Sequence, residues 1–313
     1  MTLIYPDMTA APPIVHHPAY DAKDVPDEHR FPMRKFSALA DLLREEGLVG
    51  EQGFVKPIIA PFDWVTLAHS PDYVARVFDA CVPRQEARRI GFDITEGVAR
   101  RARAAVAGTC LTARLALEHG VACNPAGGSH HASYETGAGY CVFNDVAVAA
   151  KLMQEEGLAA RILVIDFDVH QGDGTARIFA DDPSVFTLSV HCEKNWPTRK
   201  AHSDLDVGLE PDTTDGAYLE IAARAVRDAL EASKPDLVFY NAGVDPHRDD
   251  RLGKLSLSDQ GISKRDQQVF DAARDFGAPI AGVLGGGYQN DVRRLAGLHA
   301  HLHRAASRAL IAA

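Results

Sequence analysis

Short apolar runs alternate with longer segments of helical periodicity through most of the chain. The runs have the length of strands, and the segments between them repeat their apolar positions every three or four residues. The apolar runs cover residues 55–60, 121–124, 161–166, 184–190, 236–243 and 279–286, and the expected helices lie near 71–82, 95–118, 144–156, 215–233, 258–276 and 290–312. Strands that are apolar on both faces are typical of a parallel sheet covered by helices on each side. We therefore predict an α/β fold with a mostly parallel central sheet.

One long segment breaks this alternation. Residues 191–214 show no clear periodicity, and a connection of this length is uncommon unless it has a function. We expect it to be a functional loop or the rim of a site. Because no linker or internal repeat divides the chain, we also expect a single domain over residues 1–313.

Composition and charge argue against nucleic-acid and membrane partners and indicate the cellular location. The formal net charge is −10 and no basic run is present, which argues against general nucleic-acid binding. No stretch approaches the ~18 apolar residues of a membrane span, and the N-terminal residues do not resemble a secretory or transit peptide, so the expected location is the cytoplasm. The five cysteines are scattered without a C-x-x-C pair, and we expect reduced thiols at Cys81, Cys110, Cys123, Cys141 and Cys192.

The unusual polar residues follow the apolar runs. "PAGGSHH" follows residues 121–124, "DFDVHQGDG" ends the run at 161–166, "VDPHRDD" follows "VFYNAG", and "GGGY" follows "AGVL". In open parallel sheets, ligands bind outside the carboxyl ends of the strands. We therefore expect these four segments to meet at one edge and to form a catalytic site.

The segment after residue 165 has the composition of a metal site. Asp166, Asp168 and His170 are spaced by two, so an extended backbone would project all three to one side. Asp168 and His170, with Asp245 from another strand end, give an oxygen and nitrogen ligand set that leaves positions open for water and substrate. A helix cap or a cluster of salt bridges is the alternative for the first three residues alone.

Two adjacent imidazoles follow two glycines in "GGSHH". His130 and His131 each need a carboxylate on the far ring nitrogen to fix the tautomer and the basicity. Asp166 and Asp173 are the spare acids of the neighbouring loop. This pairing gives each acid of the segment a use beside the metal ligands.

A tyrosine and a second pair of histidines could each have either a functional or a structural role. Tyr288 follows three glycines at the end of a strand, where a phenol can donate a hydrogen bond to an oxygen that gains negative charge. A second adjacent pair, His16 and His17, precedes a proline without any carboxylate motif nearby. We expect Tyr288 to act in the site and the His16–His17 pair to be structural.

These segments together resemble a known family. "GGSHH", "GAGYCVFND", "DFDVHQGDG", "NAGVD" and "LGGGY", in this order, are similar to the motifs of the zinc-dependent histone deacetylase family, which includes bacterial acetylpolyamine amidohydrolases and acetoin-utilisation proteins. The similarity runs from about residue 14 to near 300, and "HRFPMRKF" resembles the class IV branch and its bacterial relatives. The resemblance implies the arginase–deacetylase α/β fold, with about eight strands in the central sheet.

The resemblance also implies a role for each matching residue. Asp168, His170 and Asp245 match the zinc ligands, His130 and His131 the catalytic pair, Asp166 and Asp173 their partners, and Tyr288 the tyrosine that polarises the carbonyl. An inner potassium site is implied at Asp166, Asp168, His170, Ser189 and the Val190 carbonyl, and an outer one at Phe179, Asp182 and Val185. Gly139, Tyr140 and Cys141 match the acyl-lysine tunnel, and Arg34 matches an arginine beside the acetate-release channel.

The predicted function is zinc-dependent hydrolysis of an acyl amide, with His131 as general base and then acid. The expected partner is the substrate: an acyl-lysine peptide or protein, or an acylated amine such as an acetylpolyamine. The sequence does not distinguish these substrates and does not indicate the oligomeric state. Both Zn²⁺ and Fe²⁺ stay open as the native metal. An arginase-type ureohydrolase is one alternative, although "DFDVH" and "NAGVD" lack the extra ligands for two manganese ions. A catalytically inactive binding module is the other, although no ligand, histidine or tyrosine is missing.

Overall fold

The computed structural model describes residues 11–311, and its centre is a parallel sheet. Six strands pair in the order β1-β6-β5-β2-β3-β4, all of them parallel. Their bounds are β1 Val121–Asn124, β2 Ile162–Asp166, β3 Val185–Cys192, β4 Leu205–Leu209, β5 Leu237–Ala242 and β6 Ile280–Leu284. Asp166, at the end of β2, pairs in register with Ser189 of β3 and Asn241 of β5. The register therefore aligns the end of β2 with the end of β5 and with the middle of β3, which continues to Cys192.

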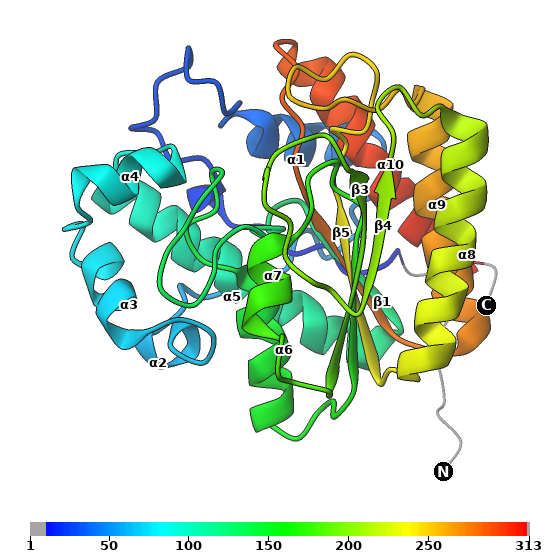
Figure 1. Cartoon of the computed structure of the whole chain (residues 1–313), viewed down its shortest axis with the longest axis horizontal. Helices are drawn as coiled ribbons and strands as arrows, with labels where there is room; N and C mark the ends of the chain where they lie inside the picture. Colours follow the sequence, from blue (N-terminus) through cyan, green and yellow to red (C-terminus); the bar gives the residue numbers. More distant parts are fainter. Residues whose placement is uncertain (1–10, 312–313) are drawn as a thin grey trace.

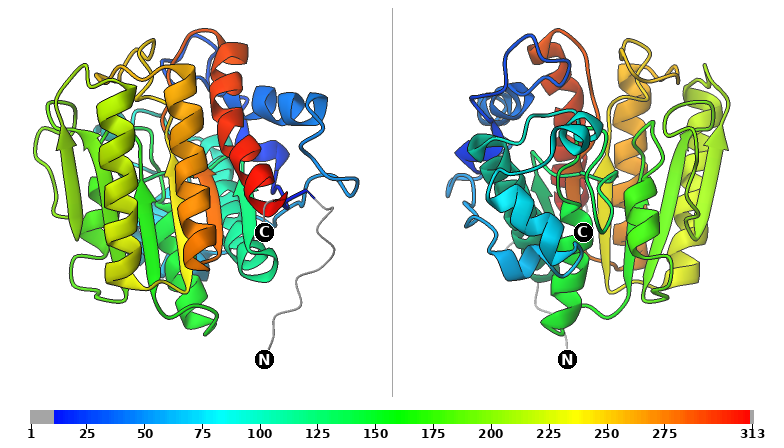
Figure 2. Two further views of the ribbon diagram at one scale, coloured as in Figure 1. Left: turned by 90° about the vertical axis from the view of Figure 1, so that its right-hand side faces the viewer. Right: turned by 60° about the vertical axis from the view of Figure 1, so that its left-hand side comes forward.

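Helices cover both faces of the sheet. α8, α9 and α10 lie side by side on one face, and α5, α6 and α7 lie on the other (Figures 1 and 2). The remaining helices gather around α5 and α10. The bounds are η1 Pro18–Tyr20, α1 Lys35–Glu45, α2 Phe62–Val65, α3 Pro71–Phe78, α4 Arg84–Ile90, α5 Glu96–His119, α6 Asp145–Glu155, α7 Asp173–Ile178, α8 Asp215–Ser233, α9 Asp259–Phe276 and α10 Val292–Ile311.

Local sequence explains where the long helices begin and end. The Ser258 hydroxyl accepts a hydrogen bond from Gly261 N at the start of α9, and Gly277 ends that helix with φ +81°. Asn144 caps α6 in the same way through Ala147 N. A side-chain cap satisfies one of the backbone N–H groups that a helix start leaves unpaired, and glycine tolerates the left-handed conformation at the end.

The predicted α/β class and parallel sheet are confirmed, and the number of strands differs. Residues 55–60 form no strand: Val55 makes only an isolated bridge to Val15. Pro57 and Pro61 explain this, because proline cannot donate to a sheet ladder. β4 lies within residues 191–214, where no element was predicted, and its exposed Asp206 and Gly208 give it the polar alternation of a short edge strand. The described residues thus form six strands rather than about eight.

Two further expectations concern the thiols and the membrane. All five cysteines are unpaired, and only Cys81 is exposed. Within residues 11–311, none of the helices combines the length and the apolar character needed to cross a bilayer. The last residue of the predicted helix at 290–312 lies outside the described residues.

Candidate metal centre and active site

Three buried side chains converge beyond the ends of β2 and β5. One ligand atom from each of Asp168, His170 and Asp245 lies within 4.8 Å of the others. His170 Nδ1 lies 2.9 Å from an oxygen of Asp168 and 3.1 Å from Asp245 Oδ2. The structure therefore brings together the three residues that the sequence predicted as metal ligands.

The donor set fits a zinc ion. Two carboxylates and one imidazole supply oxygen and nitrogen ligands and leave coordination positions open, as in catalytic zinc sites. Asp245 Oδ2 is buried and has no well-aligned hydrogen-bond donor among the described residues, although His170 Nδ1 lies 3.1 Å away. Burial, and after it the neighbouring Asp168 carboxylate, raise the pKa of Asp245. A divalent cation would compensate this orphaned oxygen and the repulsion between the two carboxylates.

Backbone N–H groups hold the two carboxylates in place. Asp168 Oδ1 accepts from His170 N at 3.0 Å, and Asp245 Oδ1 accepts from Val169 N at 2.8 Å. Gly286 N, from the loop after β6, donates to the other Asp168 oxygen. A Cβ at Gly286 would lie 2.0 Å from Asp245 Oδ2, so only glycine fits there.

The reason given for the ligand spacing differs from the structure. An extended strand through Asp166, Asp168 and His170 was expected, but β2 ends at Asp166 and residues 168–170 form bends. Asp168 N donates to Asp166 Oδ1 at 3.1 Å, which turns the chain at the strand end. Asp166 consequently faces His130, while Asp168 and His170 face Asp245.

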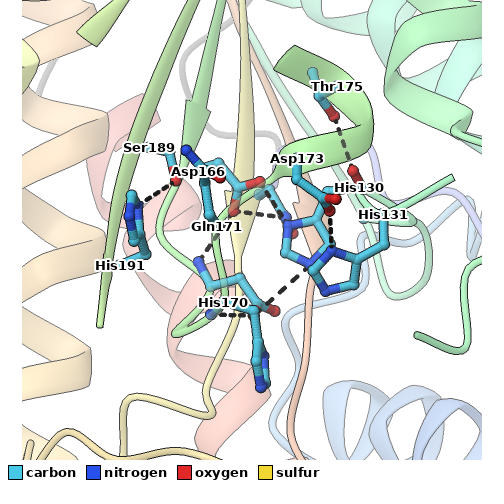
Figure 3. A network of polar contacts seen from close by, with 12 residues as sticks. His130, His131, Asp166, His170, Gln171, Asp173, Thr175, Ser189 and His191 are labelled. Carbon is cyan, nitrogen blue, oxygen red and sulfur yellow. Dashed lines mark hydrogen bonds and ion pairs between the residues drawn. The ribbon is translucent and has the colours of Figure 1, made fainter. Parts of the chain in front are cut away.

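The two adjacent imidazoles have separate carboxylate partners. His130 Nδ1 lies 2.7 Å from Asp166 Oδ2, and His131 Nδ1 lies 2.8 Å from Asp173 Oδ1 (Figure 3). The two rings are 3.8 Å apart between centroids. Each Nδ1 is thus engaged, which leaves each Nε2 for a ligand; His130 Nε2 lies 3.8 Å from Asp168.

The pKa values of the two imidazoles shift in opposite directions. Burial disfavours the charged form of both, but the Asp166 and Asp168 carboxylates outweigh it and raise the pKa of His130 to about 9. For His131, burial and then the neighbouring His130 lower the pKa to about 3. Asp173 is shared with Arg177, which reduces its effect on His131. The surroundings of the two imidazoles therefore shift their pKa values in opposite directions.

Asp145 holds the loop that carries the imidazoles. Its carboxylate accepts from Gly128 N at 3.1 Å and from Ser129 N at 2.8 Å, and it binds the Thr109 hydroxyl. Gly128 has φ +73°, and a Cβ there would lie 1.9 Å from Leu284 O. Asp145 was not predicted as a site residue, although it ends the quoted segment "GAGYCVFND".

Tyr288 lies in the buried loop after β6, beside the metal ligands. Its ring centroid is 6.4 Å from that of His170. Asp250 Oδ2 accepts from Tyr288 N at 2.7 Å, and Arg251 Nε donates to Tyr288 O. Burial, then the Asp168 and Asp245 carboxylates, raise the pKa of Tyr288 well above its usual value, so the phenol remains a donor. Asp250, the last residue of "VDPHRDD", and Arg251, which follows it, were also missed.

A small cavity of about 30 Å³ opens between these groups. Gly139, Tyr140 and Cys141 line it, as do His130, Asp168 and Tyr288. The Tyr140 ring packs against Phe31, Phe92 and Tyr288, with φ +66° at Tyr140 itself. The residues predicted for the acyl-lysine tunnel therefore lie beside the candidate metal centre.

The structure places Arg34 outside this cavity. Its side chain is 70% exposed and pairs with Asp27. The next residue, Lys35, is buried and lines the cavity instead, and Lys35 Nζ donates to Gly285 O at 3.0 Å. Consecutive helical residues point about 100° apart, so the two neighbouring cations face different surroundings, and a role of Arg34 in acetate release stays a prediction. Arg101 of α5 also lines the cavity, and nothing in its Ala-rich helix indicated this.

Trp196 is a further residue that the sequence reasoning missed. It lies in the 191–214 segment, which was expected to form the rim, and its side chain is 43% exposed. Its ring meets the His131 ring edge-on at 4.4 Å between centroids. A Cβ at Gly139 would lie 2.9 Å from the indole. Trp196 therefore forms one wall beside His131, the candidate general base. The sequence feature that could have identified it is a single aromatic residue in a polar loop.

The residues of the expected potassium sites lie at the end of β2 and in the bend after it, on β3, and in the connection between α7 and β3. Ser189 Oγ lies 3.0 Å from His191 Nδ1 (Figure 3), and Ser189 pairs with Asp166 across the sheet. Asp182 N donates to Phe179 O, Val185 N donates to Asp182 O, and the Asp182 carboxylate pairs with Lys151. Val190 is buried in β3. Potassium binding stays a prediction.

The His16–His17 pair lies apart from this centre. His17 Nδ1 accepts from Ala19 N at 2.9 Å and caps η1. The His16 ring packs against Phe54, 5.0 Å between centroids. Both imidazoles thus make local structural contacts.

Comparison with known proteins agrees with this geometry. An uncharacterised protein of Picosynechococcus sp. is 49% identical over 294 residues, which cover 94% of this chain and 98% of that protein. Histone deacetylase 2 of Arabidopsis thaliana is 31% identical (90% and 76% covered), and acetoin utilization protein AcuC of Staphylococcus aureus is 30% identical (74% and 65% covered).

Solved structures and family models extend this comparison. The HD domain of HDA15 has the same fold, with a TM-score of 0.80 at 22% sequence identity over 95% of this chain and 88% of that one. The family model for the histone deacetylase domain matches residues 29–303. The expected resemblance and fold are thereby confirmed. The chain belongs to the histone deacetylase domain family, a family of hydrolytic deacetylases.

Proposed function

We propose that the protein removes acyl groups from amines by zinc-dependent hydrolysis. One observation carries this proposal: a cavity lined by His130, Asp168 and Tyr288 lies beside the converging Asp168, His170 and Asp245 donors and the two carboxylate-paired imidazoles. When bound, zinc would act as a Lewis acid on the amide carbonyl and lower the pKa of a water molecule. Asp168, His170 and Asp245 would hold it.

The imidazole pair divides the proton transfers. Asp173 binds His131 Nδ1, so the Nε2 lone pair of His131 is free to take a proton from the attacking water. The same nitrogen then returns the proton to the leaving amine. His130, held by Asp166, stabilises negative charge near the reacting carbon. This assigns the general acid–base role to His131 and an electrostatic role to His130.

Tyr288 supplies the donor for the carbonyl oxygen. Asp250 and Arg251 fix its backbone on both sides, so the phenol is positioned before the substrate binds. A preorganised donor aimed at developing negative charge stabilises the transition state more than the ground state.

The inner cavity suits a small anionic product. Lys35 and Arg101 contribute cationic groups to a space of about 30 Å³ that also contains Gly285 and Gly286. Hydrolysis of an acetyl amide releases a carboxylate, which these cations would bind. The small volume supports short acyl groups as substrates.

The amine part of the substrate would lie at the open end. Trp196 and Tyr134 are the half-exposed aromatics of the neighbouring loops. Acyl-lysine in a peptide or protein, and an acylated small amine, are the two proposed substrate classes. The unpaired cysteines suit the reducing cytoplasm that we propose as its location.

A turnover panel tests the proposed function. Acetyl-lysine, trifluoroacetyl-lysine and longer acyl-lysine peptides would be compared with acetylated polyamines, using metal-free protein reloaded with Zn²⁺, Co²⁺ or Fe²⁺. We expect hydrolysis with acetate release and one metal ion per chain. Saturation at two transition-metal ions would favour the ureohydrolase alternative, and absence of turnover in metal-loaded protein would favour the binding module.

A further inference from the structure

Arg265 is fully buried, far from solvent and outside every sequence motif considered above. It lies on α9, 0% exposed, beneath the ends of β2 and β5. Its Nη1 donates to Phe167 O at 3.2 Å and to Gly243 O at 2.6 Å. One guanidinium thus connects the two loops that leave these strands.

Those loops carry two of the candidate metal ligands. Phe167 directly precedes Asp168, and Gly243 lies two residues before Asp245. The strand pairing still reaches Phe167 N, which donates to Asn241 O at 3.0 Å. Phe167 O and Gly243 O lie where this ladder ends, and a buried carbonyl without a donor is costly. Arg265 supplies that donor to both.

The other side of the guanidinium is anchored. Nε and Nη2 donate to Asp266 Oδ1 at 3.0 and 2.8 Å, and Tyr240 donates to the same oxygen at 2.6 Å. Arginine is suited to this place because its planar fork presents several donors in a fixed geometry. Because Asp266 holds the guanidinium of Arg265 on α9, the two loops that bind the guanidinium are held in fixed positions relative to α9.

We infer that Arg265 is a positioning residue that sets the separation of Asp168 and Asp245, and thereby the affinity of the centre for its metal ion. This inference rests on the proposed function. The competing interpretation is a core ion pair that only stabilises the fold. The two differ in one respect: a positioning residue controls metal affinity beyond its effect on stability.

The test compares two substitutions in the same network. Arg265→Lys keeps a positive charge, but a single ammonium nitrogen cannot span the distance between the two carbonyls on one side and Asp266 on the other, as the guanidinium does. Tyr240→Phe removes one hydrogen bond to Asp266 and leaves the carbonyl contacts intact. Affinity for Co²⁺ alone would be measured in the full-length metal-free chain by chelator competition and visible absorption, with thermal stability recorded for each variant.

We expect Arg265→Lys to weaken Co²⁺ binding at least about tenfold, as is typical when a group that orients a ligand is lost, and to alter the Co²⁺ spectrum. Tyr240→Phe should lower the melting temperature but leave Co²⁺ affinity within twofold of the wild type. Equal affinity in Arg265→Lys and wild type, or equal losses in both variants, would overturn the inference.

Two further outcomes keep the proposals separate. If Arg265→Lys does not fold, Asp266→Asn replaces it: the guanidinium loses its anchor, and affinity must fall more than in Tyr240→Phe. Wild-type affinity in Asp266→Asn would then refute the positioning role. Failure of the wild-type chain itself to bind Co²⁺ or Zn²⁺ would instead contradict the proposed function.

Discussion

Asp250 accepts a hydrogen bond from the backbone N–H of Tyr288 at 2.7 Å. The acid and the tyrosine come from loops after different strands, β5 and β6, so the bond ties the proposed oxyanion donor to the loop that also contains Asp245. The loop after β5 therefore positions both the Tyr288 phenol and the candidate metal ligand Asp245.

Tyr288→Phe should lower kcat by about 10²–10³, because it removes a donor to the oxygen that gains charge. The ring keeps its packing against Phe31 and Tyr140. Steady-state kinetics on the best substrate of the panel measures the loss, with metal content and melting temperature as controls near the wild type. Undiminished kcat would remove Tyr288 from the proposed mechanism.

Asp168→Ala and Asp245→Ala should lose bound metal and activity together. Each substitution removes one of the three converging ligand atoms. In the wild type, a chelator should abolish activity, and added Zn²⁺ or Co²⁺ should restore it. Metal analysis and turnover on the same samples check this. Full activity in protein shown to be metal-free would contradict zinc dependence.

His131→Ala should lose about 10²–10⁴ in rate, the range for removal of a general acid–base, while the metal content stays unchanged. His16→Ala is the matched control, since this imidazole packs against Phe54 away from the centre. Turnover rates of His131→Ala and His16→Ala are compared on the same substrate. Similar rates would show that the His130–His131 pair has no catalytic role.

Lys35→Met should weaken inhibition by acetate, because the cavity loses a cation that would bind the carboxylate product. Burial, and then Arg101, lower the pKa of Lys35 to about 8. The lysine is charged below that pH, so acetate inhibition of the wild type should weaken as the pH rises through about 8.

Two controls accompany the Lys35 prediction. Arg34→Met should leave acetate inhibition unchanged, since that side chain is 70% exposed. Lys35→Arg should retain inhibition above pH 8, because arginine stays charged. An identical pH profile in Lys35→Met and wild type would assign the acetate site elsewhere.

The α/β class and the candidate metal ligands could be predicted because their signals are local. Apolar runs mark the strands, and parallel strands place their following loops at one edge, so Asp168, His170 and Asp245 could be grouped by topology alone. Their geometry could not. Asp168 and His170 meet through a bend stabilised by Asp166, and a spacing of two residues does not distinguish a bend from an extended strand.

Supporting residues were missed for a different reason. Arg265 and Arg101 lie in helices whose sequence pattern gives only burial or exposure, and a buried arginine violates that pattern. β4 was missed because a short edge strand alternates polar and apolar residues over only five positions. Such features depend on contacts between distant segments, which periodicity does not contain.

The hydrogen bond from Lys35 to Gly285 joins residues 250 positions apart in sequence. α1, which begins at Lys35, packs on α10 near the other end of the described chain. During synthesis the N-terminal part emerges first, yet the inner cavity cannot close until β6 and its glycine turn have left the ribosome. The site would therefore be completed late, and a nascent chain would carry the imidazole pair without the finished cavity while residues 132–285 are synthesised.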